Sequence, residues 1–271
     1  MTNALTAAGD LAPPLTVAAF VTRDRARDIV HRAFPRRKAH VINCRTAAEV
    51  REVFSRELVD AAVVDLGTPT EETWRAAGLA RHFPCAGFIG LTPMRAADGP
   101  SVARCAELEF ADLCADGIDD SGLGPQIHAA AFTTRFVRAL EPAAESLGLN
   151  SVAQRRAWRA VVSYGGRPVR TVRLAATLRV TREHLSRTFA TAGAPNLKRV
   201  IDLVRLIAAS ELAKCSGYDL ADVARVLQFA SLSHLTTTAQ RVCGARAASL
   251  ARLRAGDILE RFREGRGRSR K

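Results

Sequence analysis

The spacing of hydrophobic residues changes halfway along the chain. In the first half, short apolar runs such as DAAVVDLG (residues 60–67) and AGFIGLTP (86–93) alternate with amphipathic stretches such as TAAEVREVFSREL (46–58). Short runs that are apolar throughout predict strands buried on both faces, and the stretches between them predict helices. We therefore expect residues 15–141 to form an α/β domain, with a parallel sheet covered by helices on both faces.

In the second half, apolar residues recur every three or four positions, which predicts helices. Two segments, residues 171–193 and 219–244, read alike. Each predicts a short apolar helix, a tight turn and a second helix, whose N-cap is Thr181 or Ser231. Between them, residues 196–215 predict one amphipathic helix, and twenty helical residues span roughly 30 Å. This is helix-turn-helix geometry, with a spacer close to the ~34 Å of one DNA turn.

Residues 168–250 resemble the DNA-binding domain of AraC/XylS-family transcription regulators. The resemblance is carried by LAATLRVTREHLSRTF, RLIAASEL and LADVARVLQFASLSHL. The family usually has Gly-Phe where this chain has Gln228-Phe229, and Arg and a large aromatic residue where it has Thr237 and Ala239. The resemblance implies an all-α domain with two helix-turn-helix units joined by a long helix, of which the first is the better match.

Residues 15–140 resemble the flavodoxin-like receiver domain of bacterial response regulators. DAAVVDLGTP places Asp65 at the phospho-acceptor position, and FIGLT places Thr92 at the hydroxyl position. Receivers hold Mg²⁺ with an acidic pair where this chain has Thr22 and Arg23, and they pair the phosphate with a Lys where it has Asp116. We therefore predict a pseudo-receiver, in which Arg23 can instead pair with Asp65 and hold one conformation. An ordinary solvated or capping carboxylate is the alternative for Asp65.

The two halves carry opposite charge. Residues 1–124 contain 14 Lys/Arg and 17 Asp/Glu, whereas residues 125–271 contain 26 and 10. An acidic half joined to a basic half is typical of a sensor joined to a nucleic-acid binder. A basic protein of the membrane surface is the alternative.

Other classes of protein find little support. No stretch reaches the ~18 apolar residues of a membrane span, and the first residues lack the features of a signal peptide, so we expect a bacterial cytoplasmic protein without a membrane partner. The six cysteines form no C-x-x-C pair, and we expect no metal and no cofactor. No P-loop, G-x-G-x-x-G or G-x-S-x-G is present, and we expect no enzyme.

The candidate DNA contacts are polar side chains on the outer faces of the two second helices, opposite Leu185, Phe189 and Leu235. Arg187 is the strongest candidate for reading a base, because Arg pairs bidentately with guanine, and Glu183 can accept from cytosine. For each residue, a plain solvated side chain is the alternative. The full set is Arg182, Glu183, Ser186, Arg187, Ser233, Thr236, Thr237, Gln240 and Arg241, with Arg170, Arg173 and Lys198 as further phosphate contacts.

The predicted organisation is a disordered tail (1–14), a receiver-like domain (15–141), a linker (142–150), a DNA-binding domain (151–256) and a basic tail (257–271). Residues 125–140 are expected to form one helix that closes the receiver core or dimerises. The expected partner is double-stranded DNA; a homodimer and a contact with RNA polymerase are compatible with this class. The alternative function is a protein-interaction module or co-regulator that binds DNA only non-specifically.

Overall fold

The computed structural model describes residues 13–34, 38–117, 121–190 and 195–268, which form two compact units. An α/β unit comprises Pro14–Arg135 and Cys215–Asp222. A helical unit is built from the described parts of Phe136–Lys214 and Val223–Lys271.

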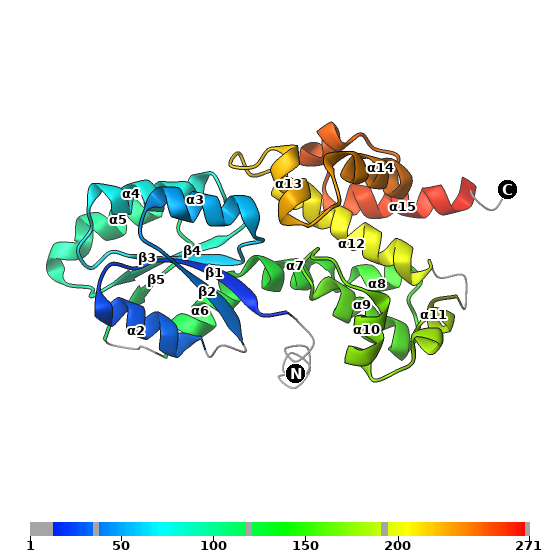
Figure 1. Ribbon diagram of the computed structural model, residues 1–271, viewed down its shortest axis with the longest axis horizontal. Coiled ribbons are helices and arrows are strands. Elements are labelled where there is room, and N and C mark those ends of the chain that lie inside the picture. The colour runs from blue at the N-terminus through cyan, green and yellow to red at the C-terminus, as the bar shows by residue number, and fades with distance from the viewer. Residues whose placement is uncertain (1–12, 35–37, 118–120, 191–194, 269–271) are drawn as a thin grey trace. The chain divides into compact units, whose positions relative to one another are not determined.

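The α/β unit contains a five-stranded sheet in the order β2-β1-β3-β4-β5, with every neighbouring pair parallel (Figure 1). This is the strand order of flavodoxin and of receiver domains, as predicted. The strands are β1 (Leu15–Phe20), β2 (Ala39–Cys44), β3 (Ala61–Asp65), β4 (Gly87–Thr92) and β5 (Asp112–Ala115).

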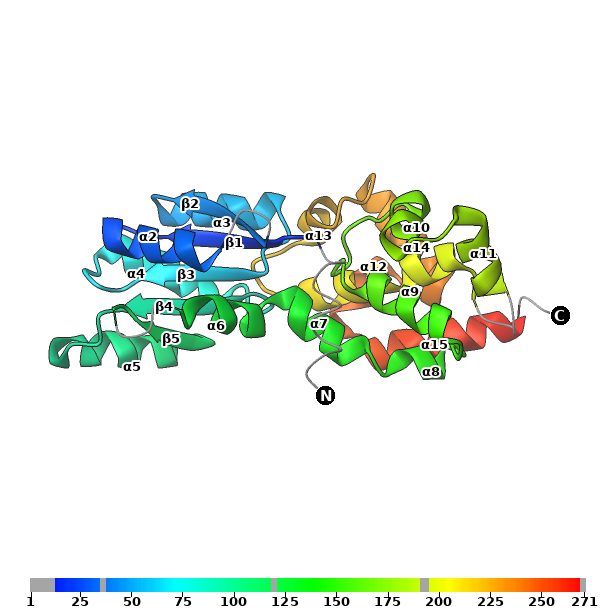
Figure 2. The ribbon, with the colours of Figure 1, turned by 90° about the horizontal axis from the view of Figure 1, so that it is seen from below.

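Helices cover both faces of this sheet (Figures 1 and 2). One face carries α2 (Asp24–Ala33) and α6 (Leu123–Ala130); the other carries α3 (Ala47–Arg56), α4 (Glu71–Gly78) and α5 (Gly99–Glu107). Behind α2, Val17 and Val63 pack with Ile29 in one buried cluster. On the other face, the ring of Phe54 stacks on those of Phe83 and Phe88, with centroids 4.3 and 5.9 Å apart. Packing on both faces explains why the strands are apolar throughout.

The single helix predicted for residues 125–140 is wrong, because the chain breaks at Ala131. Helix α6 ends there, and α7 (Phe132–Leu140) begins. The buried side chain of Asp60 fixes the break: its Oδ1 accepts from the backbone N and the hydroxyl of Thr133, at 3.0 and 2.5 Å. Its Oδ2 accepts from the backbone N of Thr16, at 2.9 Å. A carboxylate distant in sequence therefore caps α7 and joins it to β1.

In the second half, α12 (Leu197–Leu212) lies among the other helices and packs against α9, α14 and α15. It has 16 residues rather than the predicted twenty, which corresponds to roughly 24 Å. The remaining helices are α8 (Ala143–Ser146), α9 (Val152–Val162), α10 (Thr171–Leu178), α11 (Arg182–Ala190), α13 (Leu220–Val226), α14 (Leu232–Cys243) and α15 (Ala255–Arg268). Short 3₁₀ turns are η1 (Leu79–Arg81), η2 (Ala96–Asp98) and η3 (Ala247–Arg252).

Two segments predicted to lie outside the domains contain helical residues. The predicted linker 142–150 contains α8, and Leu147 and Leu149 beside it are buried. Most of the predicted basic tail belongs to α15, whose Ile258 and Phe262 are buried. Apolar residues four apart anchor this helix despite its basic character. Residues 1–12 and 269–271 of the two predicted tails lie outside the described residues.

Candidate nucleic-acid interface and strand-end cluster

The helix pairs α10–α11 and α13–α14 are joined by turns of the same geometry. Each turn holds a non-glycine residue in the left-handed conformation, Arg179 (φ 56°) or Gln228 (φ 52°). The amide of that residue donates to the carbonyl three positions back, and the next amide donates to the carbonyl five back. The distances are 3.0 and 3.0 Å in the first turn, and 2.9 and 2.8 Å in the second. Both turns therefore end their first helix in the same way.

Helix α11 presents a polar face above a buried anchor. Its cap is the predicted one, since the hydroxyl of Thr181 accepts from the backbone N of His184 at 3.1 Å. Leu185 and Phe189 are buried. The predicted contacts are all exposed, namely Arg182, Glu183, Ser186 and Arg187. This face combines the carboxylate of Glu183 with the guanidinium groups of Arg182 and Arg187. The three side chains are long and extend from the exposed face of the helix.

Helix α14 presents shorter side chains. Ser231 caps it by accepting from the backbone N of His234 at 3.1 Å, and Leu235 is buried. The predicted contacts Ser233, Thr236, Thr237 and Gln240 are exposed. However, the hydroxyls of Thr236 and Thr237 donate back to carbonyls of their own helix, at 3.0 and 2.9 Å. These two hydroxyls therefore present mainly acceptor lone pairs and a methyl group to a ligand.

Arg241, the ninth predicted contact, is engaged within the protein. Its Nη2 lies 2.7 Å from Oδ2 of Asp202 on α12. Its side chain is about half exposed, whereas that of Asp202 is largely buried. Arg241 therefore lies at the edge of the exposed face of α14.

Sequence reasoning missed Arg205, which supports the turn before α14. Its guanidinium lies 4.0 Å from the ring centroid of Phe229, and its Nη2 donates to the carbonyls of Leu227 and Gln228 at 3.0 and 3.1 Å. Burial lowers the pKa of this guanidinium below its ordinary value. The available signal was an Arg placed within the apolar pattern of a central helix, where a charge needs specific partners.

In the α/β unit, the carboxylate of Asp65 lies buried at the end of β3 and is fully engaged. Oδ2 accepts from the backbone N and hydroxyl of Thr22 and from the backbone N of Arg23, at 3.2, 3.1 and 3.0 Å. Oδ1 accepts from Nε and Nη2 of Arg23 at 2.9 and 2.7 Å, and from the backbone N of Gly67 at 3.0 Å. Burial alone would raise the pKa of Asp65, but these hydrogen bonds outweigh it and the pKa lies below its ordinary value.

Arg23 links Asp65 to Asp116, at the end of β5. Its Nη1 lies 2.6 Å from Oδ2 of Asp116, whose Oδ1 lies 2.7 Å from Nε of Arg25. The ion pair expected between Arg23 and Asp65 is thus present, and the acidic residue at the position of the receiver Lys joins the same network. Asp24 points away: its side chain is 94% exposed and pairs with Arg27. Among the described residues, the carboxylates of Asp65 and Asp116 therefore alternate with the guanidinium groups of Arg23 and Arg25, and Arg23 rather than an acidic side chain faces Asp65 from the end of β1.

Two glycines make room for the two arginines. A Cβ on Gly67 would lie 2.1 Å from Cζ of Arg23, and one on Gly117 would lie 2.3 Å from Nη2 of Arg25. Neither approach is sterically possible, so a side chain at either glycine would displace the guanidinium beside it. Gly117 also has φ +85°, which glycine adopts without strain.

Thr92 lies at the end of β4, but its hydroxyl is turned to another partner. It donates to Oδ2 of Asp98 at 3.2 Å and accepts from the backbone N of Met94 at 3.3 Å. Arg95 holds Asp98 in place, with Nη2 3.0 Å from Oδ1, and donates to the carbonyl of Gly67 at 2.7 Å. Thr92 is therefore tied to the η2 turn rather than to Asp65.

Within the described ranges, no group of three or more His, Cys, Asp or Glu is placed to hold a metal ion. Of the six thiols, five are buried and that of Cys85 is partly exposed. No helix among the described residues is both long and apolar enough to cross a membrane.

Several solved structures are similar to this chain, three of which are described below, and no curated protein matches it. Full-length FixJ from B. japonicum is 12% identical with a TM-score of 0.40, over 84% of this chain and 97% of that one. A Burkholderia pseudomallei response regulator with a phosphorylated aspartic acid is 15% identical with a TM-score of 0.36, over 64% of this chain and 97% of that one. The response regulator RcsB from Salmonella typhimurium is 15% identical with a TM-score of 0.36, over 70% of this chain and 97% of that one. At such low TM-scores, the fold assignment rests on the strand order.

The family model described as "Helix-turn-helix domain" matches residues 174–252, which extend from α10 to the end of η3. The matched stretch begins within α10 and includes α11, α12, α13 and α14. Residues 174–252 therefore form a helix-turn-helix domain of the AraC type, and they follow an N-terminal α/β domain with the strand order of a receiver.

Proposed function

We propose that this protein is a sequence-specific DNA-binding transcription regulator that reads two successive major grooves, one with α11 and one with α14. The matching turns and caps of the two helix pairs support two units of the same backbone geometry. Phosphate attraction to the basic half supplies most of the affinity, and base contacts supply the sequence preference. The mechanism is binding, without a catalysed reaction.

The proposal assigns the stronger base reading to α11. Arg187 and Glu183 lie four apart on its exposed face, and their side chains distinguish guanine and cytosine in the major groove. The threonines of α14 discriminate weakly, because their hydroxyls are bonded to their own helix. We therefore expect one half of the operator to be read more strictly than the other.

The α/β domain is proposed to act as a pseudo-receiver. One observation carries this assignment: six donor groups engage the buried carboxylate of Asp65, and the Arg23 guanidinium neutralises its charge. A metal-dependent receiver needs acidic side chains there to hold the cation that balances an incoming phosphate. The domain would then dimerise or position the DNA-binding half in one constant conformation.

Selection of genomic fragments by the purified protein, followed by titration of the best site and of a random duplex, tests the DNA-binding proposal. We expect one enriched motif, bound ~10³-fold or more tightly than random DNA. Arg187→Ala should cost about 1–3 kcal/mol and relax the motif at one position, whereas Lys214→Ala, beyond the far end of α12, should leave the motif unchanged. Equal binding of all fragments would instead favour the interaction module.

A further inference from the structure

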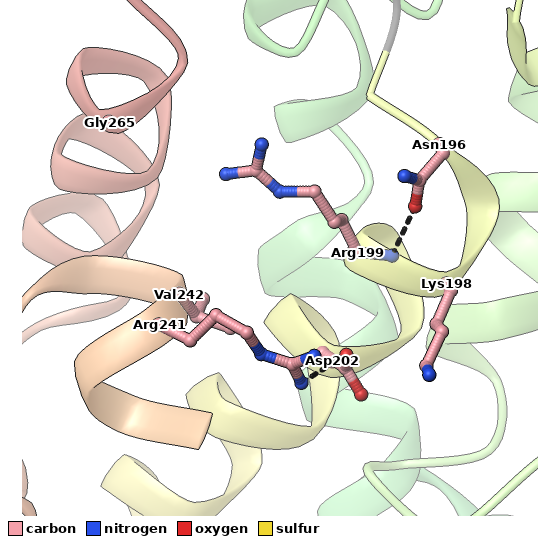
Figure 3. A pocket seen from close by; sticks show the side chains of 7 residues that line it. All are labelled: Asn196, Lys198, Arg199, Asp202, Arg241, Val242 and Gly265. Atoms are coloured by element: carbon pink, nitrogen blue, oxygen red, sulfur yellow. Dashed lines mark hydrogen bonds and ion pairs between the residues drawn. The ribbon is translucent and has the colours of Figure 1, made fainter. Parts of the chain in front are cut away.

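A basic pocket opens on the helical unit where three helices meet (Figure 3). Its volume is about 380 Å³, and its walls come from the N-terminal half of α12, from α14 at Arg241 and from α15 at Gly265. A Cβ added to Gly265 would meet no atom of the described residues within 4 Å, so these residues leave the α15 side of the pocket open.

The charges that line the pocket do not cancel. The 2.7 Å ion pair between Arg241 and Asp202 accounts for one cation and one anion. Lys198 and Arg199 remain, and over the part of the chain that the structure describes, their side-chain nitrogens form no hydrogen bond or ion pair. The guanidinium of Arg199 lies 5.0 Å from the ring centroid of Phe262, which positions the group and leaves its N–H donors for a ligand. The pocket therefore carries an excess of two positive charges.

The first turn of α12 adds to this field. Asn196 caps the helix, and its side chain accepts from the backbone N of Arg199 at 2.9 Å. The other N–H groups of a first helical turn have no partner within their helix and carry partial positive charge. A small anion with several acceptor oxygens, such as a phosphate group, matches this arrangement of donors.

We propose that this pocket binds a backbone phosphate of the DNA, at a position between the base-reading faces of α11 and α14. This inference rests on the proposed function. One residue that lines the pocket, Arg241, belongs to α14. Helix α12, whose first half lines the pocket, begins at Leu197, a few residues after α11 ends at Ala190. A phosphate bound there fixes the register of both reading helices without reading a base.

The test compares salt dependence in three full-length proteins. Lys198→Gln/Arg199→Gln removes the two excess charges, and Lys214→Gln/Arg56→Gln removes two exposed charges that each pair with a nearby Glu elsewhere. The slope of log K against log salt should fall by about 0.9 in the pocket variant, on the selected site and on random duplex alike, because one phosphate contact is lost. The control should keep the wild-type slope.

Gly265→Glu places a carboxylate at the open side of the pocket and leaves the lysine and arginine in place. It should also reduce affinity uniformly across sequences. An unchanged slope in the pocket variant, or a fall equal to that of the control, would overturn the proposal. If the wild-type protein shows no sequence preference, the proposed function is wrong, but the pocket proposal is still tested, because the salt-dependence slopes can be measured on random DNA.

Discussion

At the residue scale, several residues have a charge or a backbone conformation that is unfavourable at their position. In each case, contacts with a specific neighbour stabilise the residue. Arg23 stands where a receiver binds a cation, and its guanidinium meets two buried carboxylates. Arg205 on α12 is half-buried, and its guanidinium contacts the ring of Phe229 and the carbonyls of Leu227 and Gln228. Gln228 occupies a left-handed conformation, in which its backbone N donates to the carbonyl of Arg225 at 2.9 Å and its own carbonyl accepts from Arg205 at 3.1 Å.

Replacing Gln228 by glycine should stabilise the helical unit. The left-handed conformation costs a non-glycine residue about 1–2 kcal/mol, and glycine loses about 0.5–1 kcal/mol through its more flexible unfolded state, so we expect a net gain of roughly 0.5–1 kcal/mol. Urea denaturation in a Trp74→Phe background, followed by the fluorescence of Trp158, measures it. The control Arg225→Gly, inside α13, should instead lose about 1 kcal/mol. Equal losses in both variants would contradict the strain argument.

Asp65 should make the α/β unit sensitive to acid. Its pKa in the folded protein lies below the unfolded value of about 3.9, so its stabilising contribution is complete at neutral pH. That contribution is lost as the pH falls below about 4 and through the folded-state pKa. Denaturation at pH 7, 4 and 3, followed by Trp74 fluorescence in a Trp158→Phe background, should show a shallower decline for Asp65→Asn than for the parent. The exposed Asp24→Asn should follow the parent, and a parallel decline in all three would contradict this role.

At the element scale, helix boundaries in this protein depend on groups that cap them from outside. The hydroxyls of Thr181 and Ser231 cap α11 and α14 locally, and their positions could be predicted from sequence. The start of α7 could not, because its cap is Asp60, which is 73 residues away. The exposed faces of α11 and α14 also differ although their turns have the same geometry, so backbone geometry and surface chemistry vary independently in the two helix pairs.

Asp60→Ala should loosen α7 and the sheet together. It leaves the backbone N–H groups of Thr16 and Thr133 buried without their acceptor, at about 1–3 kcal/mol each. Hydrogen exchange followed by mass spectrometry should show faster exchange in peptides from β1 and α7. Asp60→Asn keeps one acceptor oxygen and should show a smaller effect. Faster exchange confined to one of the two peptides would mean that Asp60 does not join the elements.

At the scale of the whole molecule, an acidic α/β half precedes a strongly basic helical half. In the α/β unit, the two carboxylates of Asp65 and Asp116 are balanced by the guanidinium groups of Arg23 and Arg25. The basic half, in contrast, has exposed arginines on α11 and an excess of positive charge in the pocket beside α12. Under the proposed function, the helical half would bind DNA, and the α/β half would not accept a phosphoryl group.

Acetyl phosphate with Mg²⁺ should therefore leave the intact protein unmodified. The carboxylate of Asp65 is buried and held by six donors, and Thr22 and Arg23 stand where a receiver has the acidic pair that binds the metal. Intact-mass spectrometry should detect no added phosphoryl group, and affinity for the selected DNA site should stay the same. Incorporation that maps to Asp65 and disappears in Asp65→Asn would restore a working receiver.

The sequence by itself determined the strands, the two helix pairs, their caps and the exposed faces of α11 and α14, because hydrophobic period and capping chemistry act within a few residues. It also exposed the missing acidic pair, since that depends only on residue type. Tertiary structure decided the break at Ala131, the pairing of Arg241 with Asp202, the support of the α14 turn by Arg205, and the pocket beside α12. Each of these joins groups that are far apart along the chain, and no local pattern specifies which distant partner a buried charge or an unpaired amide will meet.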